Sequence, residues 1–307
     1  KQVIPLYRAL QGHPEAGVLW ERMITDILIN KMGFKNTSHE KNLYVGEIDD
    51  KEVLICRQVD DFAVGAASKD TVESFFTSLR SHVETEYHAM GMPCEQGVYE
   101  RYNGIDIIQT RDYVKIGCES YIDRMMMTHG WDSPTRKDSP RSTPITSDVA
   151  NRLMLLEGPP EKSAEAKQIS IKAGFSYRNV LGELIYAYVI CRLDIGYSVC
   201  FLARFADRPH VEHFAALKGV CKYFCAHKGL GLIYQKLHPH NRFPAVLFEF
   251  LEDDPNLPSF PTILRDLVTA CLDAAHATDL SQRRSVTGYV IFFGGAAIAW
   301  KSVLQPL

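Results

Sequence analysis

Two adjacent aspartates, Asp60 and Asp61, lie between two apolar, β-prone segments in the stretch VLICRQVDDFAVGA, residues 53–66. Apolar strands on both sides are typical of a central sheet, so we expect a hairpin with the carboxylates partly buried at its tip. Buried like charges repel each other and lose hydration, and they persist where a cation neutralises them. The pair therefore predicts Mg²⁺-dependent chemistry at phosphorus, with substrate phosphates completing the metal site. The alternative is a solvated turn, because Asp readily forms turns.

The segments around the pair alternate between strand and helix periodicity. Trp20, Met23 and Ile24 fall on one helical face, and the spacing of Asp70 and Glu73 is a capping box that opens another helix. The expected elements are a helix at 19–32, strands at 42–48, 52–59 and 62–67, a helix from Asp70, a hairpin at 104–118 and a helix around 121–130. This order favours an α+β domain with an antiparallel sheet.

The second half of the chain has three kinds of segment in turn: Pro/Ser-rich, helical and β-rich. Residues 133–170 are rich in Pro, Ser, Thr, Lys and Glu, which indicates a linker or an irregular extended segment. Two helical stretches follow at 177–205 and 211–229. The last stretch is β-rich, with a strand at 267–275 and a hairpin over 285–302 that turns at Gly294–Gly295.

Composition limits the possible functions. The chain of 307 residues is 46% hydrophobic with a net charge of −3, so it reads as globular and lacks the basic surplus typical of nucleic-acid binders. Its eight cysteines form no CxxC pair, and we interpret them as reduced, buried thiols in a reducing compartment. No apolar run reaches the roughly 18 residues of a membrane span. The first residue, Lys1, indicates a fragment or a processed product.

The order of the motifs resembles one known family. LQGHPEAGVLWE at 10–21, followed by the QVDD hairpin, resembles the reverse transcriptase palm of copia-type LTR retrotransposon polyproteins. Leu10, Gly12, Ala16 and Trp20 occupy the places of that family's LYGLKQAPRAW-like stretch without a gap. Residues 177–205 are similar to its connecting helices, and residues 271–302 look like the start of its ribonuclease H domain.

The resemblance implies an RNA-directed DNA polymerase with a linked ribonuclease H, both using Mg²⁺ or Mn²⁺. Asp60 and Asp61 would be catalytic, metal-binding carboxylates of the polymerase, and Gly12 and Gln58 would lie near the nucleotide and template. Asp273 would be the first catalytic, metal-binding carboxylate of the ribonuclease H. The implied partners are an RNA/DNA primer–template, deoxynucleoside triphosphates and other segments of the polyprotein, with no membrane. The implied location is cytoplasmic, within virus-like particles.

The predicted fold class is α+β, with a palm-like antiparallel sheet, a helical connection and a partial ribonuclease H-like α/β end. The predicted domains are a palm and fingers remainder at 1–132, a Pro/Ser-rich linker at 133–174, a helical thumb or connection at 175–236 and a partial ribonuclease H at 237–307.

Several positions depart from the family pattern. Gln58 replaces an aromatic or aliphatic residue, and Pro14 and Glu15 replace a Lys-Gln pair. The sequence also lacks the third palm aspartate on a strand before 10–21 and the next ribonuclease H carboxylate on a helix after 271–302. We therefore predict that this polypeptide alone neither polymerises DNA nor cuts RNA.

Two other hypotheses stand beside this one. The chain is a degenerate relic that at most binds nucleic acid or a protein, or it is an unrelated Mg²⁺ phosphohydrolase using the aspartate pair. A zinc site is disfavoured, because the spacing of the histidines and cysteines matches no familiar finger and helix-face thiols are usually core residues. The residues concerned are His210, His213, Cys221, Cys225 and His227.

Overall fold

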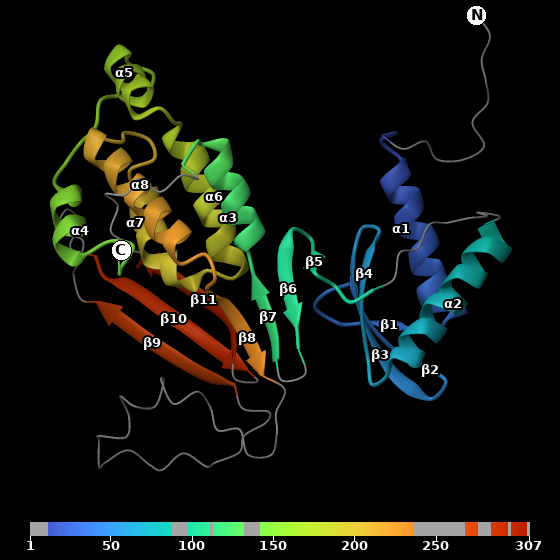
Figure 1. Cartoon of the computed structure of the whole chain (residues 1–307). Coiled ribbons are helices and arrows are strands. Elements are labelled where there is room, and N and C mark those ends of the chain that lie inside the picture. The colour runs from blue at the N-terminus through green and yellow to red at the C-terminus, as the bar shows by residue number, and fades with distance from the viewer. Residues whose placement is uncertain are drawn as a thin grey trace, which may run out of the picture. The chain divides into compact units, whose positions relative to one another are not determined.

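The computed structural model describes residues 12–87, 97–110, 113–131, 142–235, 268–275, 284–293 and 296–305 (Figure 1). The chain forms two compact units, Lys1–Asn103 and Gly104–Leu307. Both combine helices with antiparallel sheets, which confirms the predicted α+β class. In these described ranges, no helix has the length and apolar character needed to cross a membrane.

The first unit is a small sheet with two helices. Its sheet has the strand order β1-β2-β3-β4, and every neighbouring pair is antiparallel. The elements are α1 (Ala16–Asp26), the π-helical turn η1 (Ile27–Lys31), β1 (Lys35–Asn36), β2 (Leu43–Ile48), β3 (Lys51–Gln58), β4 (Asp61–Ala66), α2 (Lys69–Tyr87) and β5 (Arg101–Tyr102). The predicted helix and three strands before residue 67 are confirmed.

One apolar core joins the helices of the first unit to one face of its sheet. Ile24 of α1, Ile55 of β3 and Phe75 of α2 are buried in the same cluster. Helix α2 contributes an apolar stripe to this core, because Phe75, Leu79 and Val83 are all buried. The predicted capping residue is wrong. The Ser68 hydroxyl accepts a hydrogen bond from the Thr71 amide at 3.2 Å, so Asp70 lies inside the first turn rather than at the cap.

The second unit has a helical centre and two sheets. Strands β6, β7 and β8 form one antiparallel sheet and β9, β10 and β11 form another, with β10 in the middle. The strands are β6 (Ile105–Gln109), β7 (Tyr113–Gly117), β8 (Gly231–Gln235), β9 (Thr269–Ala275), β10 (Val286–Phe293) and β11 (Ala296–Leu304). The helices are α3 (Glu119–Thr128), α4 (Ser147–Met154), α5 (Ala164–Ala173), α6 (Tyr177–Ile190), the 3₁₀ turn η2 (Leu193–Ile195), α7 (Gly196–Ala203) and α8 (Val211–Ala226).

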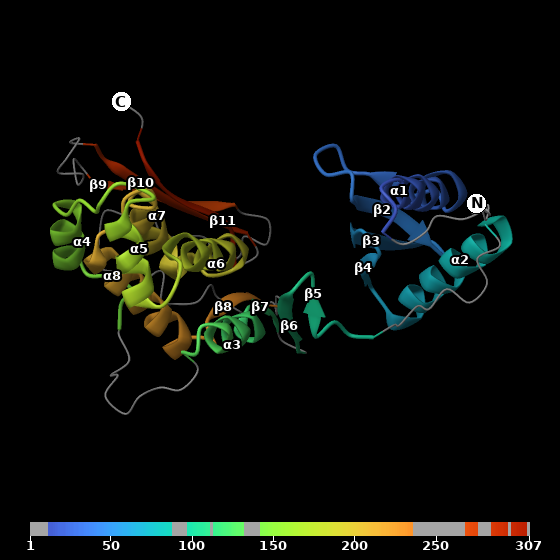
Figure 2. The ribbon, with the colours of Figure 1, turned by 90° about the horizontal axis from the view of Figure 1, so that it is seen from above.

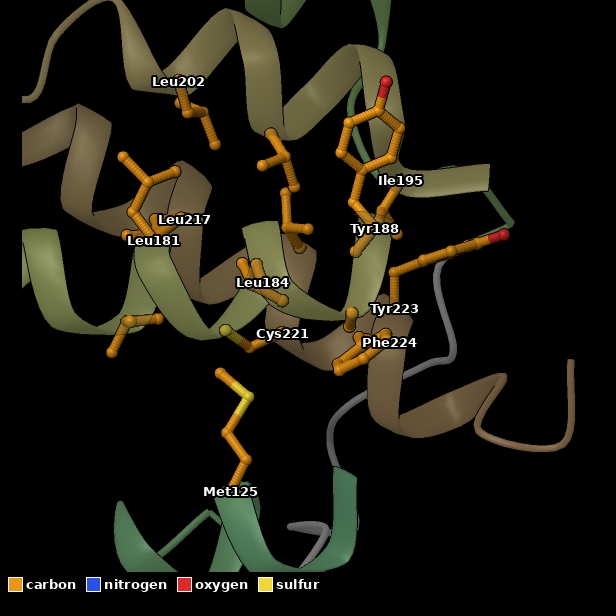
Figure 3. Packing of buried hydrophobic residues seen from close by; sticks show 14 of the residues in the cluster. Met125, Leu181, Leu184, Tyr188, Ile195, Leu202, Leu217, Cys221, Tyr223 and Phe224 are labelled. Carbon is orange, nitrogen blue, oxygen red and sulfur yellow. The ribbon is translucent and has the colours of Figure 1, made fainter. Parts of the chain in front are cut away.

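Helices α6, α7 and α8 form the core of the second unit and pack against α3 (Figure 3). Leu184, Leu202, Leu217 and Phe224 are fully buried there. Helices α6 and α7 lie on one side of the β9–β10–β11 sheet (Figure 2). The predicted helical block and terminal hairpin are therefore confirmed, although the turn residues Gly294 and Gly295 lie outside the described residues.

The predicted irregular segment at 133–170 is wrong in part, because residues 142–146 and 155–163 are irregular but the rest of its described residues are helical. It contains α4 and most of α5, which begin at the side-chain caps of Thr146 and Ser163. Each hydroxyl accepts a hydrogen bond from a backbone amide in the first turn of its helix. Ser, Thr and Pro mark helix starts and connections here, not an extended chain.

The structure contradicts part of the thiol prediction and shows how His213 is used. Cys56 and Cys271 are exposed, so the prediction that all the cysteines are buried is wrong, and Cys94 lies outside the described residues. His213 is buried and uses both ring nitrogens in hydrogen bonds, because Nε2 contacts the Leu153 carbonyl and Nδ1 accepts from the His210 amide. It therefore caps α8, and neither nitrogen is free to bind zinc.

Candidate active-site hairpin

Asp60 and Asp61 lie at the tip of the β3–β4 hairpin. Gln58 and Asp61 are its last paired residues, so Val59 and Asp60 form the turn. Both aspartates are exposed, and the prediction that they are partly buried is wrong. The buried side chains of β3 and β4 face the helices, whereas the turn extends past the core, and β4 is the edge strand of the described sheet.

The turn has an unusual backbone. Val59 has a φ of 56°, in the left-handed region that β-branched residues rarely adopt. A two-residue hairpin needs positive φ at its first turn position, and Gly or Asn usually supplies it. Such conformations persist where the surroundings fix them, and they cluster at functional sites.

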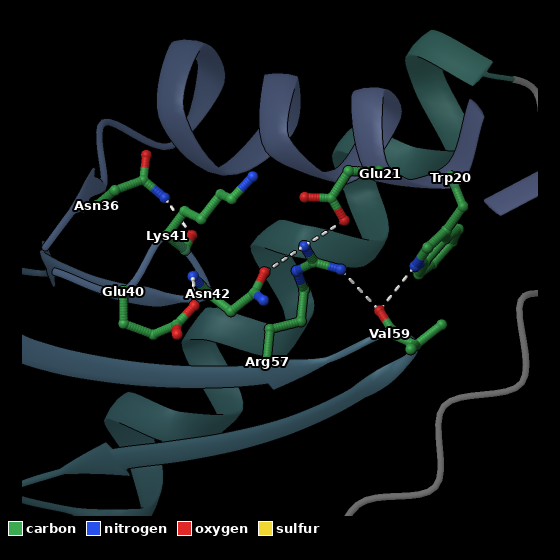
Figure 4. Close-up of polar contacts among 8 residues, drawn as sticks. All are labelled: Trp20, Glu21, Asn36, Glu40, Lys41, Asn42, Arg57 and Val59. Carbon is green, nitrogen blue, oxygen red and sulfur yellow. Dashed lines mark hydrogen bonds and ion pairs between the residues drawn. The ribbon is translucent and has the colours of Figure 1, made fainter. Parts of the chain in front are cut away.

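A buried arginine holds the turn from inside the unit (Figure 4). Arg57 is only 2% exposed. Its Nη1 donates to the Val59 carbonyl at 2.9 Å, and its Nη2 donates to Glu21 Oε2 at 2.5 Å and Asn42 Oδ1 at 2.9 Å. Trp20 Nε1 on α1 donates to the same Val59 carbonyl at 2.7 Å. The guanidinium therefore connects α1, the segment before β2 and the turn.

Electrostatics keep this arginine charged. Burial by itself lowers the pKa of Arg57, but contacts with Glu21 and with the Tyr44 hydroxyl outweigh burial and raise the pKa. Arg57 is not among the site residues predicted from the sequence. The sequence pattern that could have revealed it is the alternation along the strand, because position 57 falls on the same face as Val53 and Ile55, which are buried.

Tyr102 of β5 contacts this hairpin, and Gln58 lies within it. The Tyr102 hydroxyl donates to the Cys56 carbonyl at 3.1 Å. Burial, with smaller effects from Cys56, Tyr99 and Asp61, raises the pKa of Tyr102, so its phenol stays neutral. Gln58 is exposed and lies opposite Asp61 across the hairpin, and its place near a template stays a prediction. Gly12 lies in the exposed segment before α1 and has a φ of 86°.

Asp273 has a different setting, in the middle of a regular strand. It is exposed on β9, pairs with Gly288 of β10, and accepts a hydrogen bond from the Ala274 amide at 2.8 Å. It borders a cavity of about 300 Å³ that is also lined by Tyr197 and Lys301.

The donor set of the hairpin suits a hard divalent cation. Two adjacent carboxylates supply oxygen ligands, and Mg²⁺ in proteins commonly takes its remaining ligands from water and substrate phosphates. Across the described ranges, no group of three His, Cys, Asp or Glu residues is arranged to hold a metal ion. Asp60 and Asp61 therefore fit Mg²⁺ or Mn²⁺ as part of a site that other ligands complete.

Comparison with known proteins defines the class. Residues 1–142 match the family described as reverse transcriptase (RNA-dependent DNA polymerase). This part of the chain is therefore similar to a reverse transcriptase domain. No solved structure matches the chain.

Three of the relatives that the chain matches come from transposons. The chain is 24% identical over 306 residues to the retrovirus-related Pol polyprotein from transposon TNT 1-94 of Nicotiana tabacum, covering 99% of this chain and 20% of that protein. It is 25% identical over 303 residues to the transposon Ty5-1 protein of Saccharomyces cerevisiae, covering 97% and 80%. It is 22% identical over 308 residues to the Pol polyprotein from transposon RE1 of Arabidopsis thaliana, covering 99% and 17%.

These matches confirm the resemblance to the copia-type LTR retrotransposon polyprotein. The chain spans about a fifth of the two plant polyproteins. The ribonuclease H assignment, the domain boundaries and the roles of the site residues stay predictions.

Proposed function

We propose that this chain is the reverse transcriptase part of a retrotransposon polyprotein and that Asp60 and Asp61 bind its catalytic divalent cations. The observation that carries the proposal is the carboxylate pair at an exposed hairpin tip inside the region that matches reverse transcriptases. Bound Mg²⁺ or Mn²⁺ would supply Lewis-acid chemistry for in-line nucleotidyl transfer. The exposed turn leaves both carboxylates accessible to a primer end and a nucleoside triphosphate, and Gln58 lies beside them.

We further propose that residues 237–307 are part of a ribonuclease H domain in which Asp273 is one metal-binding carboxylate. The cavity beside Asp273 supports accessibility of this carboxylate. The proposed partners are primer–template, deoxynucleoside triphosphates and the remaining polyprotein segments, assembled in virus-like particles. By itself the chain is proposed to be inactive, because a two-metal site needs more carboxylates than the Asp60–Asp61 pair or Asp273 supplies.

The test uses the full chain and its Asp60→Asn variant. Binding to a fluorescent RNA/DNA primer–template is expected to fall steeply with salt in both proteins, because phosphate contacts release counterions. Mg²⁺ affinity should weaken roughly tenfold in Asp60→Asn, since an anionic ligand is lost. Unchanged Mg²⁺ affinity would mean that the pair is only a solvated turn.

Two outcomes would support the alternative functions, and a third would contradict the proposed inactivity. No primer–template binding at low salt supports a degenerate relic. Hydrolysis of a small phosphate ester without template supports a phosphohydrolase. Template-dependent extension of a primer by the chain alone would contradict the proposed inactivity.

A further inference from the structure

One carbonyl in the candidate site receives hydrogen bonds from two side chains of different elements. The Val59 oxygen accepts from Trp20 Nε1 at 2.7 Å and from Arg57 Nη1 at 2.9 Å (Figure 4). Val59 directly precedes Asp60, so these two donors fix the peptide plane that enters the carboxylate pair. Two donors on one carbonyl restrict its rotation more than one donor can.

The turn needs an external restraint because its own sequence does not favour its conformation. Val59 is 59% exposed, so packing of its side chain contributes little to holding a φ of 56°. A β-branched residue at positive φ is a genuine outlier that relaxes unless its surroundings hold it. The only side-chain hydrogen bonds to Val59 in the described chain are those from Trp20 and Arg57.

The restraint is itself anchored in the body of the unit. Arg57 is buried, and Glu21 and Asn42 fix the far side of its guanidinium at 2.5 and 2.9 Å. The Arg57 amide also donates to the Asn42 carbonyl at 2.9 Å. The Arg57 guanidinium cannot move without breaking several of these hydrogen bonds. It therefore restrains the Val59 carbonyl that it also bonds.

We propose that Trp20 and Arg57 are positioning residues that hold the Asp60–Asp61 turn in its cation-binding conformation. The cation-binding part of this inference rests on the proposed function, whereas the restraint on the turn does not. Neither residue touches the cation; both act through the Val59 carbonyl.

The experiment compares the full wild-type chain with Trp20→Phe, which removes the indole N–H and keeps an aromatic ring. Trp131→Phe is the matched control, because it makes the same change in the second unit. Backbone ¹⁵N relaxation of Asp60 and Asp61 is measured without metal, and Mn²⁺ affinity is then measured by electron paramagnetic resonance of the free ion.

In Trp20→Phe we expect the order parameters of the Asp60 and Asp61 amides to fall from about 0.85 toward 0.6. The Mn²⁺ dissociation constant should rise about three- to tenfold, because a smaller fraction of the chain has the binding-competent turn. Arg57→Lys should act in the same direction, since an ammonium keeps the charge but cannot bridge Glu21, Asn42 and Val59 together. Trp131→Phe should change neither quantity.

The two measurements separate the inference from the function it builds on. If Trp20→Phe and Arg57→Lys leave the turn rigid and the Mn²⁺ affinity unchanged, the positioning role is overturned while cation binding stands. If the turn loosens but the wild type binds no Mn²⁺, the restraint is supported and the proposed function fails. A role in stability alone would lower the unfolding midpoint without changing Mn²⁺ affinity at temperatures well below it, and that result also overturns the inference.

Discussion

Arg57 in the first unit and Arg192 in the second are both buried, with 2% and 0% of their surface exposed. Each contacts one carboxylate, Glu21 at 2.5 Å or Asp194 at 2.7 Å. Each also leaves one nitrogen, Nε of Arg57 and Nη1 of Arg192, without a hydrogen-bond partner among the described residues. In both, burial lowers the pKa but the carboxylate partner helps raise it, so both guanidinium groups stay charged.

The two arginines differ in how far they reach. Arg192 binds Asp194, two residues along the chain, through Nε at 2.8 Å and Nη2 at 2.7 Å, and it lies 4.6 Å from the ring centre of Phe224. It therefore shapes the connection between α6 and α7 from within that connection. Arg57 joins segments far apart in sequence and ends at an exposed turn. A buried arginine thus stabilises the α6–α7 connection in the second unit, whereas a buried arginine restrains the candidate site in the first unit.

Removing the acidic partner of Arg192 should have the largest effect. Asp194→Ala leaves a fully buried guanidinium without its carboxylate, and we expect the second unit to lose about 3–5 kcal/mol of unfolding free energy. Urea unfolding followed by the fluorescence of Trp131 and Trp300 measures this. Asp194→Asn is the control, because it keeps an acceptor. A loss below about 1 kcal/mol would mean that the pair is not a buried ion pair in energetic terms.

Removing the acidic partner of Arg57 should lower the unfolding free energy by a smaller amount. Glu21 is 49% exposed, and Arg57 keeps Asn42 and the Val59 carbonyl, so Glu21→Ala should lower the unfolding free energy of the first unit by about 1–2 kcal/mol. Trp20 fluorescence in a variant with Trp131 and Trp300 changed to Phe measures it. Equal losses for Glu21→Ala and Asp194→Ala would remove the distinction between the two arginines.

Acid should destabilise the second unit through His213. Burial lowers the pKa of His213 below its ordinary 6.5, so the unfolded chain binds a proton that the folded chain resists. Stability from this group is present above about pH 6.5 and decreases below it, by at most about 1.4 kcal/mol per pH unit. Urea unfolding of wild type and His213→Gln between pH 7 and 5 should differ in slope, and identical slopes would contradict this role.

The smallest expected effect is an increase in the stability of the first unit. Val59→Gly removes the steric cost of a φ of 56°, and the exposed side chain gives up little buried area. We expect the unfolding free energy of the first unit to rise by about 1 kcal/mol. The midpoint of its urea transition measures this. A loss of stability would show that the turn is unstrained.

Much of the secondary structure follows from the sequence because periodicity reports burial directly. The alternation of Val53, Ile55 and Arg57 marks one face of β3, and the stripe of Phe75, Leu79 and Val83 marks one face of α2. The same approach failed where composition replaced periodicity. At 133–170, Ser, Thr and Pro suggested irregular chain, but Thr146 and Ser163 cap helices.

The candidate site was only half predictable. The adjacent carboxylates are visible in the sequence, but their exposure depends on β4 being an edge strand, which no local pattern shows. The restraint from Trp20 and Arg57 joins side chains 39 and 2 residues from Val59 and depends on how α1 packs on the sheet. The contacts of Trp20 with Val59 and of Arg57 with Glu21 are long-range in sequence and need the tertiary structure.

The most direct test of the account is paramagnetic broadening by substoichiometric Mn²⁺ in the ¹⁵N-labelled full chain. If the pair binds the cation, the amides of Asp60, Asp61 and the adjoining hairpin residues broaden selectively, and this broadening is lost in the variant carrying Asp60→Asn and Asp61→Asn. Broadening that spares the hairpin, or that is the same in the double variant, would contradict cation binding by this pair.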